Sequence, residues 1–213
     1  MYGHHTKPIV CFDIETVALE PDPEEFEASY MPPRNYKDPE KIKEHKEKAY
    51  KEWVEKQQFK RDGAKIISIA WGLVEETPTL KHVSGMCSDN EVDPLRAFTV
   101  FLGDLGTYKL MGFNINSFDL PILSVRLAKY GLHLPGKVAK WDAIDLFEWP
   151  LQRSMGLKKA CRVYNVENRL KMDGADVAEL YANRKLAEIE DYNRNDVFVT
   201  IGLYNALSRT YQI

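Results

Sequence analysis

The segment PIVCFDIET, from Pro8 to Thr16, sets both the fold class and the chemistry of the chain. It is short, apolar and β-branched until two acids interrupt it, which predicts a buried strand. Successive side chains of a strand point to opposite faces, so Asp13 and Glu15 project from one face. Because neighbouring carboxylates repel each other unless protons or cations neutralise them, the pair indicates a Mg²⁺ or Mn²⁺ site. The alternative is an exposed edge strand with two solvated acids, but the otherwise apolar run Ile9–Ile14 favours a central strand.

The remaining hydrophobic patterns predict an α/β chain in which strands come first and then alternate with helices. Two further strands are expected over 65–74 and 79–83, adjacent, antiparallel and joined by a tight turn around 75–78. Later strands are expected over 109–113 and 138–144, and helices over 94–106, 120–130, 157–166 and 182–211. This order predicts a mixed five-stranded sheet flanked by helices.

Residues 20–62 read as a charged insertion between the first two strands. Proline and glutamate enrich 21–39, which predicts an irregular segment before a helix from about Asp38 to about Lys60. Between Asn35 and Asp62 nine lysines and arginines face seven acids, a net charge of +2, while apolar residues recur in a narrow helical stripe. We expect an insertion that packs on the domain by one face rather than an arm that binds nucleic acid.

The composition, with 44% hydrophobic and 29% charged residues, is typical of one globular domain, which we place over residues 1–213. The sequence contains neither an apolar run long enough to span a membrane nor a signal peptide, so a cytoplasmic protein without membrane contact is expected. The isolated cysteines Cys11, Cys87 and Cys161 fit a reducing compartment. The net charge of −3 argues against coating nucleic acid through bulk charge, so a polyanion must meet a local patch or bound cations.

Two more segments carry acids at places suited to a site. The segment GFNINSFDLP, 112–121, lies where a strand ends and a helix begins, the position at which open α/β sheets bind ligands. Its Asp119 is either a site residue or the N-cap of the following helix. In YNRND, 192–196, a spacing of four puts Tyr192 and Asp196 on one helix face.

Taken together, these segments resemble the three motifs of the DEDD exonucleases of the DnaQ-like group. FDIET resembles the first motif, GFNINSFDLPIL resembles the second motif of family-B DNA polymerase exonuclease domains, and YNRND resembles the third. Tyrosine four residues before the last aspartate is typical of the DEDDy branch; the DEDDh branch has histidine where this chain has Asp191. Over about 9–207 the chain is similar to stand-alone exonucleases related to the polymerase-B proofreading domain, a resemblance that implies the RNase H-like fold.

The resemblance implies a metal-dependent 3′→5′ exonuclease that hydrolyses single-stranded or frayed DNA ends to nucleoside 5′-monophosphates with two Mg²⁺ or Mn²⁺ ions. It implies that Asp13 bridges the ions, that Glu15 and Asp196 hold the ion on the nucleophile side, and that Asp119 supports the other ion. Tyr192 is expected to orient the attacking water rather than to act as its base, because a phenol with its ordinary pKa of about 10 is protonated at neutral pH and a cation-bound water can be far more acidic.

Substrate contacts near the ions are expected from three residues. Asn114 and Phe118 are placed beside the terminal nucleotide, although Phe118 fits a core position equally well. Thr16, directly after the first motif, is expected to line the same pocket.

A second group of substrate contacts is expected from a basic segment. Between 151 and 171 six basic residues face Glu167 alone, a balance of +5 that either holds a phosphate backbone or forms a solvated helix face. Its proposed contacts are Lys158, Lys159 and Arg162.

Single-stranded DNA is the preferred substrate, and RNA is the runner-up because RNA-trimming members of the branch share the same five residues. A catalytically idle nuclease fold that serves as a binding module is the alternative from another class. Four crowded carboxylates have little physical reason to persist without a cation, which argues against it. Because 213 residues do not suffice for a polymerase as well, a polymerase or repair partner would act in trans.

Overall fold

The structure of the protein, a computed structural model, describes residues 7–136, 143–168, 172 and 174–211. Its centre is a five-stranded sheet in the order β3-β2-β1-β4-β5. The strands are β1 (Ile9–Ala18), β2 (Ala64–Leu73), β3 (Val83–Cys87), β4 (Lys109–Gly112) and β5 (Ile144–Asp145). The β1–β2 and β2–β3 pairs are antiparallel, whereas β1–β4 and β4–β5 are parallel. This confirms the mixed five-stranded sheet of the expected RNase H-like fold and the central position of the first strand.

Two strands differ from the sequence-based expectation. The segment 80–82 forms a 3₁₀ turn, η1 (Leu80–His82), and β3 follows it instead of covering 79–83. Pairing with β2 fixes this register, since Val83 lies opposite Gly72 and Cys87 opposite Ser68. The strand expected over 138–144 falls largely on 137–142, which lie outside the described residues, and β5 begins at Ile144.

The expected helices are present, with shifted ends. They are α3 (Val92–Leu105), α4 (Asp119–Lys129), α5 (Leu157–Val163) and α7 (Leu186–Tyr211). A 3₁₀ turn, η3 (Gly174–Asp176), and a short helix, α6 (Val177–Ala182), precede α7. The helix expected from 182 starts at Leu186 because the chain turns through Arg184, whose φ is +56°. Within the described part of the chain, no helix is long and apolar enough to cross a membrane.

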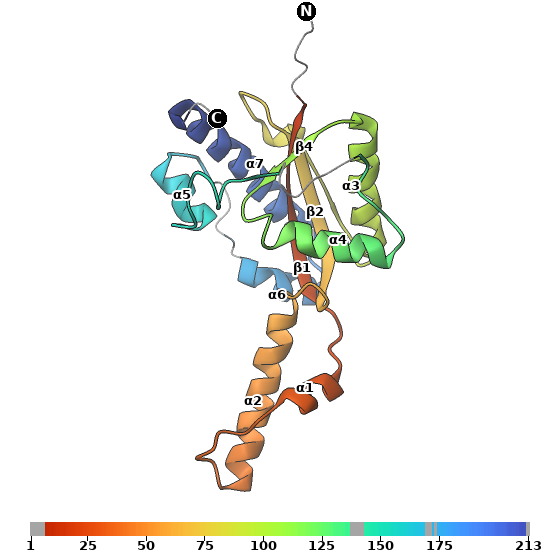
Figure 1. Ribbon diagram of the computed structural model, residues 1–213, viewed down its shortest axis with the longest axis vertical. Coiled ribbons are helices and arrows are strands. Elements are labelled where there is room, and N and C mark those ends of the chain that lie inside the picture. Colours follow the sequence, from red (N-terminus) through yellow and green to blue (C-terminus); the bar gives the residue numbers. More distant parts are fainter. Residues whose placement is uncertain (1–6, 137–142, 169–171, 173, 212–213) are drawn as a thin grey trace, which may run out of the picture.

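The alternating side chains of β1 belong to two cores. Phe12 and Ile14 pack with residues of α3 and α4, whereas Cys11 packs with Val197 and Ile201 of α7. Figure 1 shows α3 and α4 on one side of the sheet and α7 on the other. Burial of a ring such as that of Phe12 contributes about 1.5–3 kcal/mol, which makes a register shift of β1 costly.

The insertion folds as a helical arm instead of an irregular segment followed by one helix. Its helices are α1 (Pro23–Ser29), which the sequence analysis missed, and α2 (Pro39–Gln57), and each begins with an aspartate cap followed by proline. Phe26 of α1 packs against Tyr50 and Trp53 of α2, with ring centroids 5.1 and 5.7 Å apart. The apolar stripe of α2 therefore packs on α1 rather than on the sheet, and the pair projects from the body of the molecule (Figure 1).

Candidate metal centre

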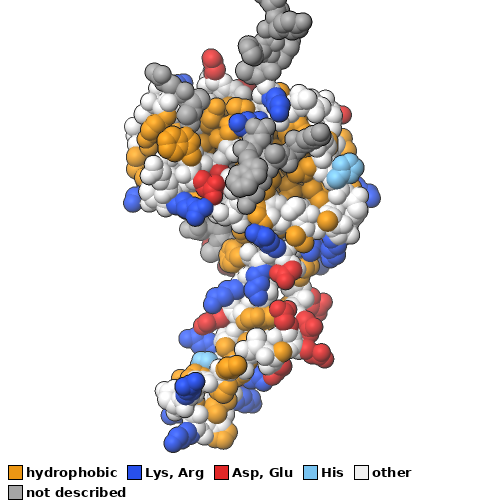
Figure 2. All heavy atoms as spheres, viewed as in Figure 1, with side chains coloured by type: hydrophobic (Ala, Val, Ile, Leu, Met, Phe, Trp, Pro, Cys, Tyr) orange, Lys and Arg blue, Asp and Glu red, His pale blue; other side chains and the backbone are white. Residues whose placement is uncertain are grey.

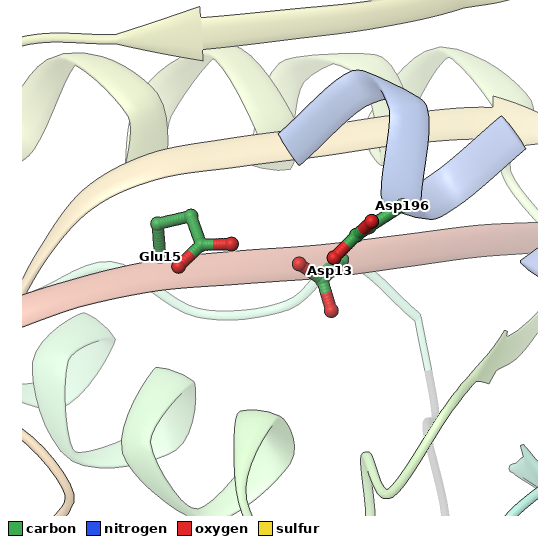
Figure 3. A group of neighbouring side chains, drawn as sticks. All are labelled: Asp13, Glu15 and Asp196. Carbon is green, nitrogen blue, oxygen red and sulfur yellow. The ribbon is translucent and has the colours of Figure 1, made fainter. Parts of the chain in front are cut away.

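Three carboxylates meet between the sheet and α7. Asp13 and Glu15 come from β1 and Asp196 comes from α7, and one ligand oxygen from each lies within 4.8 Å of the others. All three side chains are half-buried, and Figure 3 shows their carboxylates converging. The side-chain alternation of β1 places the first two on one face of the sheet, as the sequence predicts, and α7 covers this face in the structure.

Small residues on the neighbouring strand leave room for this cluster. The cross-strand partner of Asp13 is Ala70 and that of Glu15 is Ser68. Cross-strand neighbours lie on the same face of a sheet, so larger side chains at these two positions would fill the space above β1. The site is therefore built into the packing between β1, β2 and α7.

Asp119 lies beside the cluster but faces the backbone of β1. The carboxylate is 2% exposed, and its Oδ1 accepts a hydrogen bond from the Ile14 amide at 3.1 Å. The parallel ladder between β1 and β4 extends over Ile9–Cys11, so this bond follows where the ladder stops. The N-cap interpretation was wrong, since Asp119 is the first residue of α4 and the preceding Phe118 occupies the cap position.

The carboxylates raise one another's pKa values. Burial raises the pKa of Asp13 well above its usual range, and the charges of Asp119, Glu15 and Asp196 raise it further. Burial, Asp196 and Asp119 do the same for Glu15. Burial also raises the pKa of Asp119, to about 7. Ionising such a group without a counter-charge is costly, and oxygen-only donors suit hard divalent cations, so the residues fit Mg²⁺ or Mn²⁺.

Asn193 fixes the orientation of Asp13. This asparagine is fully buried on α7, and its Nδ2 donates to Asp13 Oδ2 at 2.6 Å, while Ser68 Oγ donates to its Oδ1 at 3.1 Å. Its amide opposes the rise in the pKa of Asp13. This role was not predicted from the sequence, although Asn193 precedes Asp196 by three residues and such a spacing places both on one helix face.

Tyr192 lies at the same site with a neutral phenol. The side chain is 6% exposed, and burial is the main reason that its pKa lies above the usual value. The charges of Asp196, Glu15 and Asp13, together with a hydrogen bond to Asp196, raise that pKa further. A phenol in this setting is a hydrogen-bonding group rather than a base.

Asp145 holds the loop that leads to Asp119. It is 4% exposed and accepts backbone hydrogen bonds from Asn114 at 2.8 Å and Asn116 at 3.0 Å. Asn114 has a φ of +66°, a left-handed conformation that asparagine tolerates better than most residues. A Cβ at Gly112 would lie 2.8 Å from the carbonyl oxygen of Phe12, so glycine lets this loop start close to β1. The sequence does not distinguish Asp145 from other acidic residues outside the three motifs, so this role could not be predicted from it.

The predicted substrate residues near the cluster occupy different environments. The Thr16 hydroxyl is 6% exposed and donates to the Gln58 carbonyl at 2.8 Å, so it links β1 to the end of the arm. Phe118 is partly buried against the core between the sheet and α4, and its ring centroid lies 6.3 Å from that of Phe59.

The residues predicted to contact the phosphate backbone lie on α5. This helix also carries Cys161, whose thiol is close enough to Asp196 for the charge of the carboxylate to affect its pKa. Burial, followed by the charge of Asp196, raises the pKa of that cysteine to about 11. Lys159 and Arg162 are exposed and Lys158 is half-buried. The structure thus brings α5 near the carboxylates, while its role toward a phosphate backbone stays a prediction.

Comparison with known families identifies a match for most of the chain. A family model described as "Predicted 3'-5' exonuclease related to the exonuclease domain of PolB" matches residues 57–210. The matched range contains Asp119, Tyr192 and Asp196 and begins after β1. Asp13 and Glu15 are therefore joined to the matched residues by the geometry of the cluster. No curated protein sequence matches the chain.

A solved structure with a similar fold is that of the family B DNA polymerase from the hyperthermophilic archaeon Pyrobaculum calidifontis. The TM-score is 0.57 at 15% sequence identity, and the alignment covers 97% of this chain and 25% of the polymerase chain. At this identity the likeness shows the fold, and the chain spans about a quarter of the polymerase's length.

Proposed function

Because the chain belongs to the family of predicted 3′-5′ exonucleases related to the exonuclease domain of PolB, we propose that it is a metal-dependent 3′→5′ exonuclease. The proposed reaction shortens single-stranded or frayed DNA and releases nucleoside 5′-monophosphates. The observation that carries the proposal is the convergence of Asp13, Glu15 and Asp196 within 4.8 Å, since the first two lie outside the matched range.

The proposed metal ligands are the three clustered carboxylates, with Asp119 supporting a second ion. Bound Mg²⁺ or Mn²⁺ ions supply charge neutralisation at the scissile phosphate and the leaving oxygen, and they acidify the attacking water. The high pKa values of Asp13, Glu15 and Asp119 support this assignment, because cations relieve the repulsion that raises them.

The protein's own groups have positioning roles in this proposal. Asn193 keeps one oxygen of Asp13 occupied, so the other oxygen is available toward the cluster. The backbone amide of Ile14 holds Asp119. The buried, neutral phenol of Tyr192 orients the attacking water, because its raised pKa makes it unsuitable as a ground-state base.

The wider setting is also part of the proposal. We place the activity in one domain over 1–213 in which residues 20–62 form the arm. A cytoplasmic location is supported by three free cysteines, and a polymerase or repair partner in trans by the likeness to part of a polymerase.

The test uses end-labelled single-stranded DNA and RNA of identical sequence, incubated with Mg²⁺, Mn²⁺ or EDTA. We expect metal-dependent shortening from the 3′ end, faster on DNA, and a loss of at least about a hundredfold in Asp13→Asn. Asp104→Asn, an exposed aspartate of α3, is the matched control and should keep full activity.

Each other outcome has a definite meaning. If RNA is shortened faster than DNA of the same sequence, RNA is the preferred substrate. Cleavage that survives in Asp13→Asn would exclude the cluster as its source. No cleavage of either strand with any metal would contradict the proposed function.

A further inference from the structure

The end of the arm is fixed at the border of the metal centre by two contacts. The Gln58 carbonyl accepts the hydroxyl of Thr16 at 2.8 Å, and the Phe59 ring lies 6.3 Å from the Phe118 ring at 51°. Thr16 follows Glu15 in the chain, and Phe118 precedes Asp119. The segment that closes the arm is therefore attached next to two carboxylate-bearing residues.

Phe59 is the exposed member of this aromatic pair. It is 63% exposed, whereas Phe118 packs partly into the core. Single exposed apolar side chains are common, but this ring packs against Phe118, which directly precedes the site residue Asp119. The ring therefore has an open face beside Phe118, the residue that directly precedes Asp119.

The charges around Phe59 favour a nucleic acid as the molecule that covers it. Residues 56–62 carry three basic side chains and one acidic side chain, and the basic Lys60 and Arg61 directly follow Phe59 and are exposed. Aromatic rings next to cations bind single strands, because each base has a face that stacks and each phosphate attracts a cation. Elsewhere on the arm, Figure 2 shows side chains of both signs.

We propose that Phe59, supported by Phe118, stacks on a base near the 3′ end of the bound strand, so that the arm contributes a substrate contact to the metal centre. This inference rests on the proposed function and adds the residue that grips the strand. It explains why the arm is fastened through Gln58 and Phe59 at this border while its aromatic cluster packs internally.

The test combines substitutions that remove the Phe59 ring with oligonucleotides that lack one base near the 3′ end. Phe59→Leu keeps apolar volume but loses the aromatic face, and Phe59→Tyr keeps the face. Oligonucleotides with a base-free residue at the first, second or third position from the 3′ end are compared with the intact strand. The matched control is Tyr36→Leu, an aromatic residue that precedes α2 and packs on His45 of that helix, with ring centroids 5.5 Å apart, rather than at the Phe59 end.

We expect Phe59→Leu to lower kcat/KM on the intact strand about tenfold, mainly through KM. Phe59→Tyr and Tyr36→Leu should stay within about twofold of the wild type. When one of the three positions lacks its base, the kcat/KM of the wild type should fall by the same factor of about ten. On that base-free strand, Phe59→Leu should lower kcat/KM no further. The melting temperature of Phe59→Leu should match the wild type, since the side chain is mostly exposed.

Binding measured by fluorescence anisotropy with Ca²⁺ in place of Mg²⁺ separates this inference from the proposed function. If the strand is cleaved, but the losses caused by Phe59→Leu and by the missing base are independent at all three positions, the stacking is overturned and the exonuclease proposal stands. If the protein does not cleave the strand, but removing the Phe59 ring and removing one base cause non-additive losses of binding affinity, the exonuclease proposal is overturned and the stacking is supported. No cleavage together with additive losses, or with no binding at all, would overturn both.

Discussion

Among single residues, Asn193 has the clearest positioning role outside the carboxylates. It is bonded to Asp13 on one side and to Ser68 on the other, so it links the helix to two strands at the centre of the site. Groups that orient metal ligands strengthen metal binding, because a ligand that rotates freely loses entropy when it binds.

We predict that Asn193→Ala weakens the binding of Mn²⁺ about 10- to 100-fold, measured by isothermal titration calorimetry. Asn205→Ala is the control, since Asn205 lies on the same helix and donates to the Glu75 carbonyl at 2.7 Å. Equal affinities in the two variants would show that Asn193 has no part in orienting Asp13.

Asp119 makes the stability of the metal-free protein depend on pH. Its pKa is raised from about 3.8 to about 7 in the folded chain, mainly by burial. Between these values the unfolded chain releases the proton first, so the folded state binds more protons and stability falls as pH rises. The loss expected from this one carboxyl group between about pH 4 and about pH 7 is on the order of 4 kcal/mol.

Urea unfolding in EDTA, compared between the wild type and Asp119→Asn, measures this contribution. The variant keeps an oxygen for the Ile14 amide but does not ionise, so it should gain stability relative to the wild type as pH rises through the range. A constant difference between the two proteins across the range would exclude the raised pKa.

At the scale of elements, a buried ion pair joins β2, α3 and α4. Glu91, directly before α3, accepts hydrogen bonds from the Ile66 amide of β2 and from Arg126 Nε of α4, each at 2.7 Å. Both charged side chains are 3% exposed. Since α4 begins with Asp119, this pair also fixes the helix that presents a site carboxylate.

We predict that Arg126→Met lowers the free energy of unfolding by about 3–5 kcal/mol, because it leaves the charge of Glu91 buried without its partner. The control is Arg184→Met, which removes an exposed ion pair of 3.6 Å with Asp89 and should cost less than about 1 kcal/mol. Urea unfolding measures the free energy of unfolding of both variants. Similar losses in the two would contradict the prediction that the buried ion pair contributes more than the exposed one.

In the whole molecule, the sheet domain and the arm have separate apolar clusters. The rings of Phe26, Tyr50 and Trp53 lie within α1 and α2, whereas the buried residues of β1 pack with α3, α4 and α7. Regions with few buried contacts open more readily than the main core. The arm should therefore open locally without unfolding of the sheet.

Hydrogen exchange followed by mass spectrometry tests this separation. In Phe26→Ala, amides of α1 and α2 should exchange at least about tenfold faster than in the wild type, while those of β1 and β2 keep their rates. Faster exchange throughout the sheet would mean that arm and sheet unfold as one unit.

Several features of the fold and the candidate site could be predicted from local sequence. The apolar run around Asp13 and Glu15 predicts a central strand with both acids on one face, and the structure has this arrangement. The spacing within 192–196 predicts that Tyr192 and Asp196 share a helix face. Strand and helix periodicity is a local property, so it survives in the tertiary structure.

Other features arise where distant segments meet. The amino-acid sequence by itself determined β1, the helix faces and the acids available for a site. The tertiary structure decided that Asp196 lies next to Asp13, that Asn193 holds that aspartate, and that Phe59 near the end of the arm lies beside Phe118. These contacts depend on how α7 and the arm pack against the sheet, and such packing is set by the complementarity of whole surfaces rather than by any local pattern.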